Sequence, residues 1–200
     1  MLKSDIISSE KRMIIDIGHK SFIEYNPNFL DENESQEYLK ELLSIKEWQQ
    51  GVYSMYGKEV KTPRLLWAMR ENDFKVPKGY SVTGNTEFTP LIKKLKDKVE
   101  QYCNTKLKYA QLNYYRDGND YIGWHSDNEV IDGDIIASIS LGANRKFSLK
   151  SKDDFLKYDL NLKNGSLLIM DSNASKNLWK HSLPKMKTND LRINITFRNK

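Results

Sequence analysis

The sequence predicts a mainly β protein with flanking helices. Two segments with helical spacing of apolar residues precede residue 107, and short β-like runs follow it at regular intervals. Sequences that favour turns, such as Asn164-Gly165, separate these runs. Many short strands with turn signals are typical of a sandwich, a jelly roll or a barrel, so we expect the two helices to brace the outer face of one sheet.

The first helix is predicted over residues 32–45. Acidic residues near its start would interact favourably with the positive N-terminal end of the helix dipole. A second helix is predicted to begin at Pro90, since Thr89 can cap it and proline fits the first helical position. The apolar positions at helical spacing are Tyr38, Leu39, Leu42 and Leu43 in the first helix, and Leu91, Ile92, Leu95, Val99 and Tyr102 in the second.

The strands are predicted in the second half of the chain. Each run is short, rich in β-branched or aromatic residues, and bounded by Gly, Asn, Asp or Ser. The predicted runs are 107–115, 121–125, 135–141, 145–149, 158–162, 165–170, 177–182 and 191–198.

Composition places the chain among globular proteins. It has 200 residues, 30% charged and 38% hydrophobic, which suits one domain with a sizeable core. Cys103 is the only cysteine, which excludes a disulfide framework and makes a reducing intracellular compartment (nucleus or cytoplasm) the expected location. The N-terminus lacks the apolar stretch of a signal peptide, and no run has membrane-spanning length. The net charge of +5 suits a polyanionic partner without requiring one.

Two of the three histidines lie where an iron site would need them. His125 and Asp127 occur in the run Trp124-His125-Ser126-Asp127, and residues two apart share a face if the strand continues through them. With His181 they supply two imidazoles and one carboxylate, the facial triad of non-haem Fe(II) oxygenases. The His-x-Asp pattern alone is weak, and a surface histidine beside a turn aspartate is the alternative interpretation.

The last predicted strand carries two arginines on one face. Alternation places Arg192, Asn194, Thr196 and Arg198 together and turns the apolar residues the other way. An iron-chelating dicarboxylate needs a partner for its far carboxylate, and arginine offers a planar fork that fits one. A solvated edge strand is the alternative.

These motifs together resemble the AlkB family of Fe(II)- and 2-oxoglutarate-dependent nucleic-acid dealkylases. The resemblance is specific from about residue 62 to 198, and the most similar branch is the eukaryotic pair that repairs methylated DNA. It rests on Pro63-Arg64-Leu65, Asn113-Tyr114-Tyr115-Arg116-Asp117-Gly118, Trp124-His125-Ser126-Asp127-Asn128-Glu129, residues 136–143, residues 164–170, Trp179-Lys180-His181-Ser182-Leu183-Pro184 and the 192–198 strand.

The resemblance implies a double-stranded β-helix, a jelly roll with the metal in its mouth. Residues 1–200 would form one domain, with 1–106 as an N-terminal helical and nucleotide-recognition lid region and 107–200 as the catalytic core. By resemblance, His125, Asp127 and His181 bind iron and act as the catalytic centre. Arg192 would hold the distal carboxylate of 2-oxoglutarate, and Asn113, Tyr115, Asn194 and Arg198 would complete that pocket.

The implied activity is oxidative demethylation of 1-methyladenine and 3-methylcytosine in DNA or RNA. Fe(II), O2 and 2-oxoglutarate would be consumed in a reaction that releases formaldehyde, succinate and CO2. Since a methyl group inside a duplex is out of reach, the base must be flipped out. The expected partner is therefore methylated DNA or RNA, with no membrane and a monomeric enzyme.

Several residues are expected to contact the substrate. Glu129 would favour a cationic base, although a solvated loop acid is the alternative. Tyr80 resembles the family's lid over the base, whereas Val82 stands where relatives often carry an aromatic residue. Tyr56 in Met55-Tyr56-Gly57-Lys58 could fill the gap left by a flipped base, or it could be a tyrosine in a hairpin turn. Arg64 completes the expected contacts, and Lys150 could touch phosphates or simply be solvated.

Two other functions remain open at this point. The same iron core could serve an oxygenase that acts on protein or on a small molecule. A non-catalytic nucleic-acid-binding module with a relic pocket is the second alternative, and the complete set of metal and cosubstrate residues argues against it.

Overall fold

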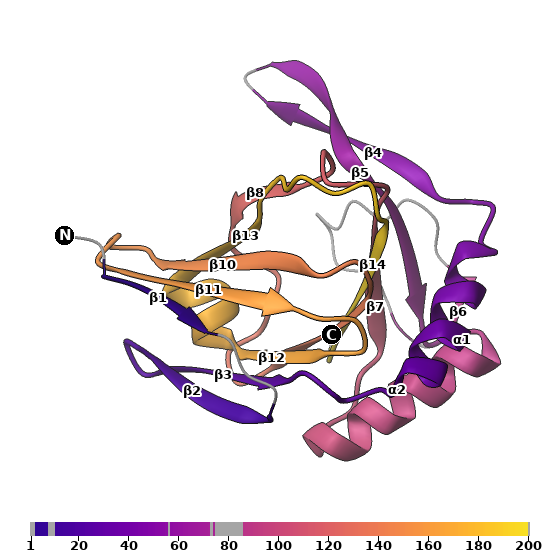
Figure 1. Ribbon diagram of the computed structural model, residues 1–200, viewed down its shortest axis with the longest axis horizontal. Coiled ribbons are helices and arrows are strands. Elements are labelled where there is room, and N and C mark those ends of the chain that lie inside the picture. Colours follow the sequence, from indigo (N-terminus) through magenta and orange to yellow (C-terminus); the bar gives the residue numbers. More distant parts are fainter. Residues whose placement is uncertain (1–2, 8–10, 56, 73, 75–85, 200) are drawn as a thin grey trace.

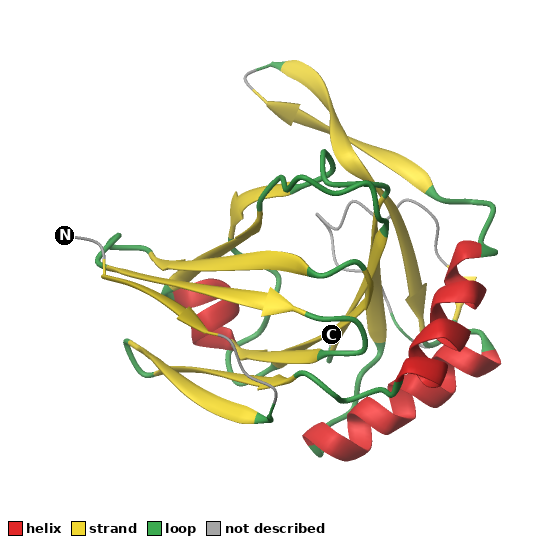
Figure 2. Ribbon diagram, viewed as in Figure 1, coloured by secondary structure: helices red, strands yellow, loops and turns green. Residues whose placement is uncertain are grey.

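The structure is a computed structural model that describes residues 3–7, 11–55, 57–72, 74 and 86–199. Two β-sheets face each other, and the two α-helices lie together on the outside of the larger sheet (Figures 1 and 2). Among these residues, no helix has the length and the apolar character needed to cross a membrane.

The larger sheet has nine strands and carries the C-terminal strand near its middle. Strand β14 lies antiparallel between β9 and β7, so both of its edges are hydrogen-bonded. The order is β2 (Met13–Gly18), β3 (Ser21–Asn26), β12 (Leu167–Asp171), β9 (Ile135–Gly142), β14 (Arg192–Arg198), β7 (Tyr109–Tyr115), β5 (Lys58–Arg70) and β4 (Gln49–Met55), with β6 (Thr86–Glu87) paired to β5.

The smaller sheet has five strands, and one of its edges carries the metal-site motif. Its order is β1 (Lys3–Ile7), β11 (Leu156–Leu162), β10 (Arg145–Ser151), β13 (Trp179–Leu183) and β8 (Ile122–His125). The chain crosses repeatedly between the two sheets, which is the expected jelly roll. The mainly β fold class with flanking helices is therefore confirmed.

The helices begin where the sequence predicts. Helix α1 (Glu32–Leu43) is closed by a capping box between Asp31 and Glu34. Helix α2 (Pro90–Cys103) is capped by the Thr89 hydroxyl and ends at Asn104, which adopts a left-handed conformation with φ of 50°. Both helices bury their apolar stripe against the larger sheet, so the prediction that they brace one outer face is confirmed.

The two faces of β14 have different surroundings. Ile193, Ile195 and Phe197 are fully buried under the helices, as part of one core cluster. The other face looks between the sheets. A second apolar cluster fills that space at one end, and it includes Phe147, Leu149, Leu160, Met170 and Trp179. The pocket adjoins this cluster, since Phe147 and Met170 belong to both.

All eight predicted β runs coincide with strands β7 to β14. The described part of the first 106 residues also contains six strands, β1 to β6, that were not predicted from the sequence. They extend both sheets, because β1 pairs with β11, β3 with β12 and β5 with β7. A short π-helix, η1 (Asn173–Asn177), was likewise not predicted.

Candidate metal and cosubstrate site

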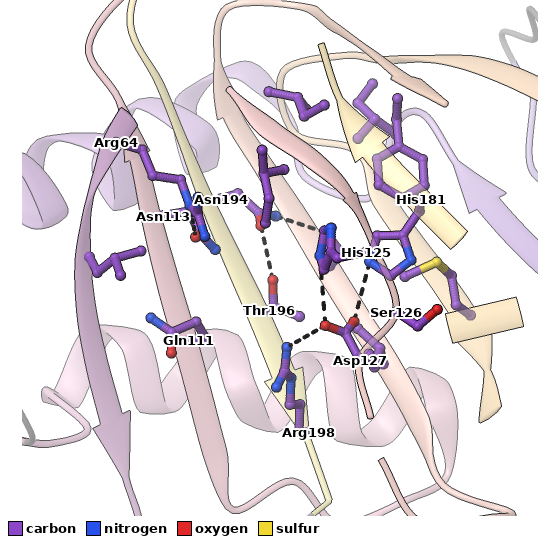
Figure 3. Close-up of a pocket in the computed structure, with 18 of the residues that line it drawn as sticks. Arg64, Gln111, Asn113, His125, Ser126, Asp127, His181, Asn194, Thr196 and Arg198 are labelled. Carbon is purple, nitrogen blue, oxygen red and sulfur yellow. Dashed lines mark hydrogen bonds and ion pairs between the residues drawn. The ribbon is translucent and has the colours of Figure 1, made fainter. Parts of the chain in front are cut away.

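A pocket of about 520 Å³ opens between the two sheets. The smaller sheet contributes His125 and His181, and the larger sheet contributes the polar face of β14. Figure 3 shows His125, Asp127 and His181 pointing toward one another on one side of this pocket. These side chains were expected to lie together, and the fold brings them together from β8, the loop after it, and β13.

The three side chains have the geometry of a metal site. One ligand atom from each lies within 4.8 Å of the others. The Asp127 carboxylate is 3.8 Å from Nε2 of His125 and 3.4 Å from Nε2 of His181. A metal bound at about 2.0–2.2 Å needs neighbouring ligand atoms about 3 Å apart, so the three side chains would move closer together on binding it. The donor set of two imidazoles and one carboxylate suits Fe(II) with open positions.

The tautomer of His125 is fixed by the backbone. Its Nδ1 lies 2.8 Å from the carbonyl oxygen of Gly123. If Nδ1 donates to that oxygen, Nε2 keeps its lone pair and points at the site, which is the usual arrangement for a metal-binding histidine.

Asp127 reaches the site from a loop and not from a continuing strand. Strand β8 ends at His125, and the alternation that we expected through residue 127 does not occur. Instead, the backbone N–H of Asp127 donates to the carbonyl of Ser175 at 2.9 Å. Ser175 lies in the π-helix, so η1 sets the position of the carboxylate.

The charge states of Asp127 and His125 suit a metal. Burial alone would raise the pKa of Asp127, but Arg198, His181 and His125 hold it well below its usual range. Burial, together with the neighbouring His181, lowers the pKa of His125 to about 4. At neutral pH the carboxylate is therefore ionised and the imidazole of His125 is neutral, as metal ligands must be.

Arg192 is a buried cation with unused hydrogen-bond donors. It is 2% exposed, and its Nη2 donates to the Ser140 hydroxyl at 2.8 Å. Its Nε and Nη1 have no partner among the described residues, and burial lowers its pKa to about 10. Buried charged groups are normally paired, so this guanidinium fits an absent anion. The distal carboxylate of 2-oxoglutarate is such an anion.

Tyr115 lies between two buried arginines. The guanidinium of Arg192 is 5.3 Å from the ring centroid, and that of Arg145 is 5.6 Å away. Arg145 is fully buried and donates to three backbone carbonyls, those of Asp117, Asp120 and Pro184. It therefore joins the two loops that flank Tyr115.

The other expected cosubstrate residues also line the pocket. Asn113 accepts a hydrogen bond from Arg64 at 2.7 Å. Arg64, which was expected to contact the substrate, therefore lies beside the cosubstrate residues. Asn194 donates to the Ser138 hydroxyl at 2.7 Å. Figure 3 shows Asn194 and Thr196 between these residues and the metal site.

Arg198 and Glu129 form an ion pair beside the metal site. A guanidinium nitrogen of Arg198 contacts the Glu129 carboxylate, and another lies 3.4 Å from Asp127. Glu129 lines the pocket, as expected, although the strand that was to carry it ends earlier. Arg198, an expected cosubstrate residue, therefore contacts Glu129, an expected substrate residue.

Several residues in and around the site were not predicted from the sequence. Ser138 and Gln111 line the pocket, Ser140 accepts a hydrogen bond from Arg192, and Arg145 lies against Tyr115. The two serines alternate in the otherwise apolar β9, so this polar alternation was a usable signal. No local pattern marks Arg145 as buried. Three expected substrate contacts, Tyr56, Tyr80 and Val82, lie outside the described residues. Lys150 is described, but it does not line the pocket.

Comparison with known proteins agrees with this geometry. Residues 22–198 match the 2OG-Fe(II) oxygenase superfamily. The chain is 31% identical to DNA oxidative demethylase ALKBH2 of Arabidopsis thaliana over 222 residues, covering 96% of this chain and 70% of that protein. It is 30% identical to alpha-ketoglutarate-dependent dioxygenase alkB homolog 3 of Homo sapiens over 187 residues, covering 86% of this chain and 64% of that protein.

A shorter match covers human DNA oxidative demethylase ALKBH2, with 36% identity over 120 residues, 54% of this chain and 46% of that protein. The chain thus spans only about two thirds of the length of the longer-matching relatives. The superfamily match nevertheless covers most of the chain, including all three candidate metal ligands and Arg192. The chain belongs to the 2OG-Fe(II) oxygenase superfamily, whose enzymes are dioxygenases that use Fe(II), 2-oxoglutarate and O2.

Proposed function

We propose that this protein oxidatively demethylates N-alkylated bases, 1-methyladenine and 3-methylcytosine, in DNA or RNA. The observation that carries the proposal is one pocket in which a His-Asp-His set lies near a buried arginine with unpaired donors. The names of the relatives, which are DNA oxidative demethylases and dioxygenases, support the choice of substrate. The net charge of +5 suits a polyanionic substrate.

In this proposal each pocket residue has a defined task. His125, Asp127 and His181 hold one Fe(II) and leave the remaining positions open. Arg192 binds the distal carboxylate of 2-oxoglutarate through Nε and Nη1, the two atoms without a partner. The remaining cosubstrate contacts come from Asn113, Tyr115, Asn194 and Arg198.

The chemistry belongs to the cosubstrate and the metal, which together supply the oxidant when bound. One oxygen atom of O2 enters succinate as 2-oxoglutarate loses CO2. The other enters a C–H bond of the N-methyl group, and the hydroxymethyl product breaks at its C–N bond to release formaldehyde and the restored base. The protein orients the reactants and keeps water away from them.

Glu129 is the residue that we assign to the charge of the lesion. Bases methylated at N1 of adenine or N3 of cytosine are cationic, and a carboxylate in the pocket favours them. Because Arg198 neutralises part of that carboxylate, the preference for a cation should be moderate.

We further propose that the chain acts as one domain and as a monomer. Residues 107–200 would be the catalytic core, and residues 1–106 would supply the lid over the flipped base. A reducing compartment, the nucleus or the cytoplasm, suits the single Cys103, whose pKa burial raises to about 11.

The test is mass spectrometry of methylated oligonucleotides after incubation with protein, Fe(II), 2-oxoglutarate and ascorbate. Single- and double-stranded DNA and RNA are compared, with Asp127→Ala as the control. Loss of one methyl group with stoichiometric formaldehyde supports the proposal. Turnover of 2-oxoglutarate without demethylation of any oligonucleotide would indicate an oxygenase for protein or a small molecule. Failure to bind Fe(II) would indicate a non-catalytic module.

A further inference from the structure

Two exposed aromatic side chains lie next to the metal site, each beside a lysine. Trp124 is 42% exposed and Tyr121 is 36% exposed. The Lys150 ammonium is 5.2 Å from the Trp124 ring centroid, and the Lys185 ammonium is 5.2 Å from that of Tyr121. Neither aromatic residue lines the pocket, so the function proposed above gives them no task.

A β-bulge explains why Trp124 points outward. In the pairing of β8 with β13, His125 lies opposite His181 and Ile122 lies opposite Leu183. Three residue steps on β8 therefore match two on β13, which is the signature of one extra residue on β8. Because of it, Ile122 and His125 both line the pocket, while Trp124 is exposed.

The surroundings of Trp124 are open and positively charged. Strand β8 is the edge of the smaller sheet, and a side chain added at Gly123 would meet nothing within 4 Å. On the neighbouring strands, Lys150 lies opposite Lys180 in the β10–β13 register, and Lys180 is exposed. Asp154 holds Lys150 at 2.7 Å, so the charge on this side is reduced but not removed.

We propose that Trp124 and Lys150 form a binding site for the nucleotide next to the flipped base in single-stranded nucleic acid. This inference rests on the proposed function, because the strand must enter the pocket beside His125. A base would stack on the Trp124 indole, and its phosphate would meet Lys150 or Lys180. Tyr121 and Lys185 would hold the strand on the other side of Gly123.

The chemistry of the site favours a single strand over a duplex. Proteins that bind single strands combine exposed aromatic rings with positive charge, because each unstacked base offers a free π-face. In a duplex those faces are covered by the neighbouring bases, so a ring on a protein surface cannot stack on them without disrupting the helix. A simpler interpretation is that the lysine stems only shield two exposed rings from water.

The first experiment measures binding without catalysis. Of the four tryptophans, Trp67 and Trp179 are buried and Trp48 is partly buried, so Trp124 is the most accessible one. An unmethylated oligo(dT) of about ten nucleotides, within the usual site size, is titrated into the metal-free protein. We expect quenching of tryptophan fluorescence that Trp124→Phe removes. Quenching that persists in Trp124→Phe would overturn the assignment.

The second experiment measures catalysis. Trp124→Ala should raise the KM for a methylated single-stranded oligonucleotide roughly 5- to 150-fold, with kcat nearly unchanged. The KM for a methylated mononucleotide, which has no flanking base, should stay the same, and Trp124→Phe should recover most of the loss. A KM equal to that of the wild type in Trp124→Ala would refute the proposal, and so would an equal rise for the mononucleotide.

Two further variants separate stacking from general effects. Phe22→Ala removes another exposed aromatic residue, 48% exposed and on β3 of the other sheet, and should change neither KM nor quenching. Lys150→Ala should reduce the slope of log affinity against log salt by about 0.7 for a single strand. An equal loss on duplex and single-stranded substrates in Trp124→Ala would overturn the single-strand assignment. If the wild type demethylates no oligonucleotide, the proposed function fails, while the oligo(dT) titration still tests the binding site.

Discussion

Replacing Arg192 with Met should weaken 2-oxoglutarate binding and stabilise the cosubstrate-free protein at the same time. Arg192 is buried, and Nη2 donates to Ser140, whereas Nε and Nη1 have no hydrogen-bond partner in the part of the chain that the structure describes. Its charge is therefore poorly solvated until an anion arrives. Methionine follows the course of the arginine stem without its charge, so the substitution removes mainly the guanidinium group.

The magnitudes follow from the structure. A hydrogen bond to a charged group contributes about 1.5–3 kcal/mol, so the loss of one such bond to the carboxylate weakens binding roughly 10- to 150-fold. Burial lowers the pKa of Arg192 from 12.5 to about 10, which at about 1.36 kcal/mol per unit corresponds to roughly 3 kcal/mol. Because the folded state disfavours the proton, this cost is present at neutral pH and declines only as the pH rises above about 10.

Calorimetric titration of 2-oxoglutarate into Mn(II)-loaded protein measures the affinity without turnover, and thermal unfolding measures the stability. Without cosubstrate, Arg192→Met should melt at a higher temperature, by up to roughly 6–12 °C for 3 kcal/mol at about 2–4 °C per kcal/mol. Added 2-oxoglutarate should stabilise the wild type more than the variant. Arg145→Met is the matched control, since that buried arginine donates to three carbonyls, and its loss should lower the melting temperature. An unchanged 2-oxoglutarate affinity in Arg192→Met would refute the reasoning.

Three other predictions concern the remaining charged groups. Asp127→Ala should abolish Fe(II) binding and demethylation while circular dichroism shows an intact fold; turnover at the wild-type rate would contradict the metal assignment. Glu129→Gln should lower activity more on 1-methyladenine and 3-methylcytosine than on neutral lesions, and equal losses measured by mass spectrometry would exclude a charge-reading role. Burial alone would raise the pKa of Glu100, but hydrogen bonds from Leu107, Lys96 and Lys106 hold it below its usual value. The ionised Glu100 therefore stabilises the fold at neutral pH, and this stabilisation is lost as the pH falls through the lowered pKa. Glu100→Gln should therefore cost about 3–5 kcal/mol of unfolding free energy at pH 7 and less in acid, as denaturant titrations would show.

The polar face of β14 could be predicted from the sequence because it depends on a local rule. Residues two apart on a strand share a face, so Arg192, Asn194 and Arg198 had to lie together once the strand was recognised. The same rule found the strands from residue 107 onward. The helices could be predicted equally well, since Thr89, Pro90 and the apolar spacing all mark the start of α2.

The six N-terminal strands could not be predicted in the same way. Strand β2 keeps Ile14 66% exposed, and β5 mixes lysines with apolar residues, so neither has a clean alternation. These strands form because β12, β11 and β7 offer hydrogen-bonding edges, which are contributed by segments far away in the chain. A local sequence pattern contains no information about the strand edge that a distant segment will offer.

The candidate metal site depends partly on a local sequence pattern and partly on a distant segment of the chain. The fold brings together the three residues that the sequence predicted as metal ligands, but the prediction attributed the position of Asp127 to a strand that ends at His125. The backbone N–H of Asp127 donates to the carbonyl oxygen of Ser175, which lies in a π-helix that no local sequence pattern predicted, and this bond positions the residue. The Lys176 ammonium also donates to the carbonyl of Val130 at 2.8 Å, so the π-helix holds the loop at two points. Changes in η1 should therefore disturb metal binding without altering any ligand, whereas a continuous strand through residue 127 would have made the site independent of that segment.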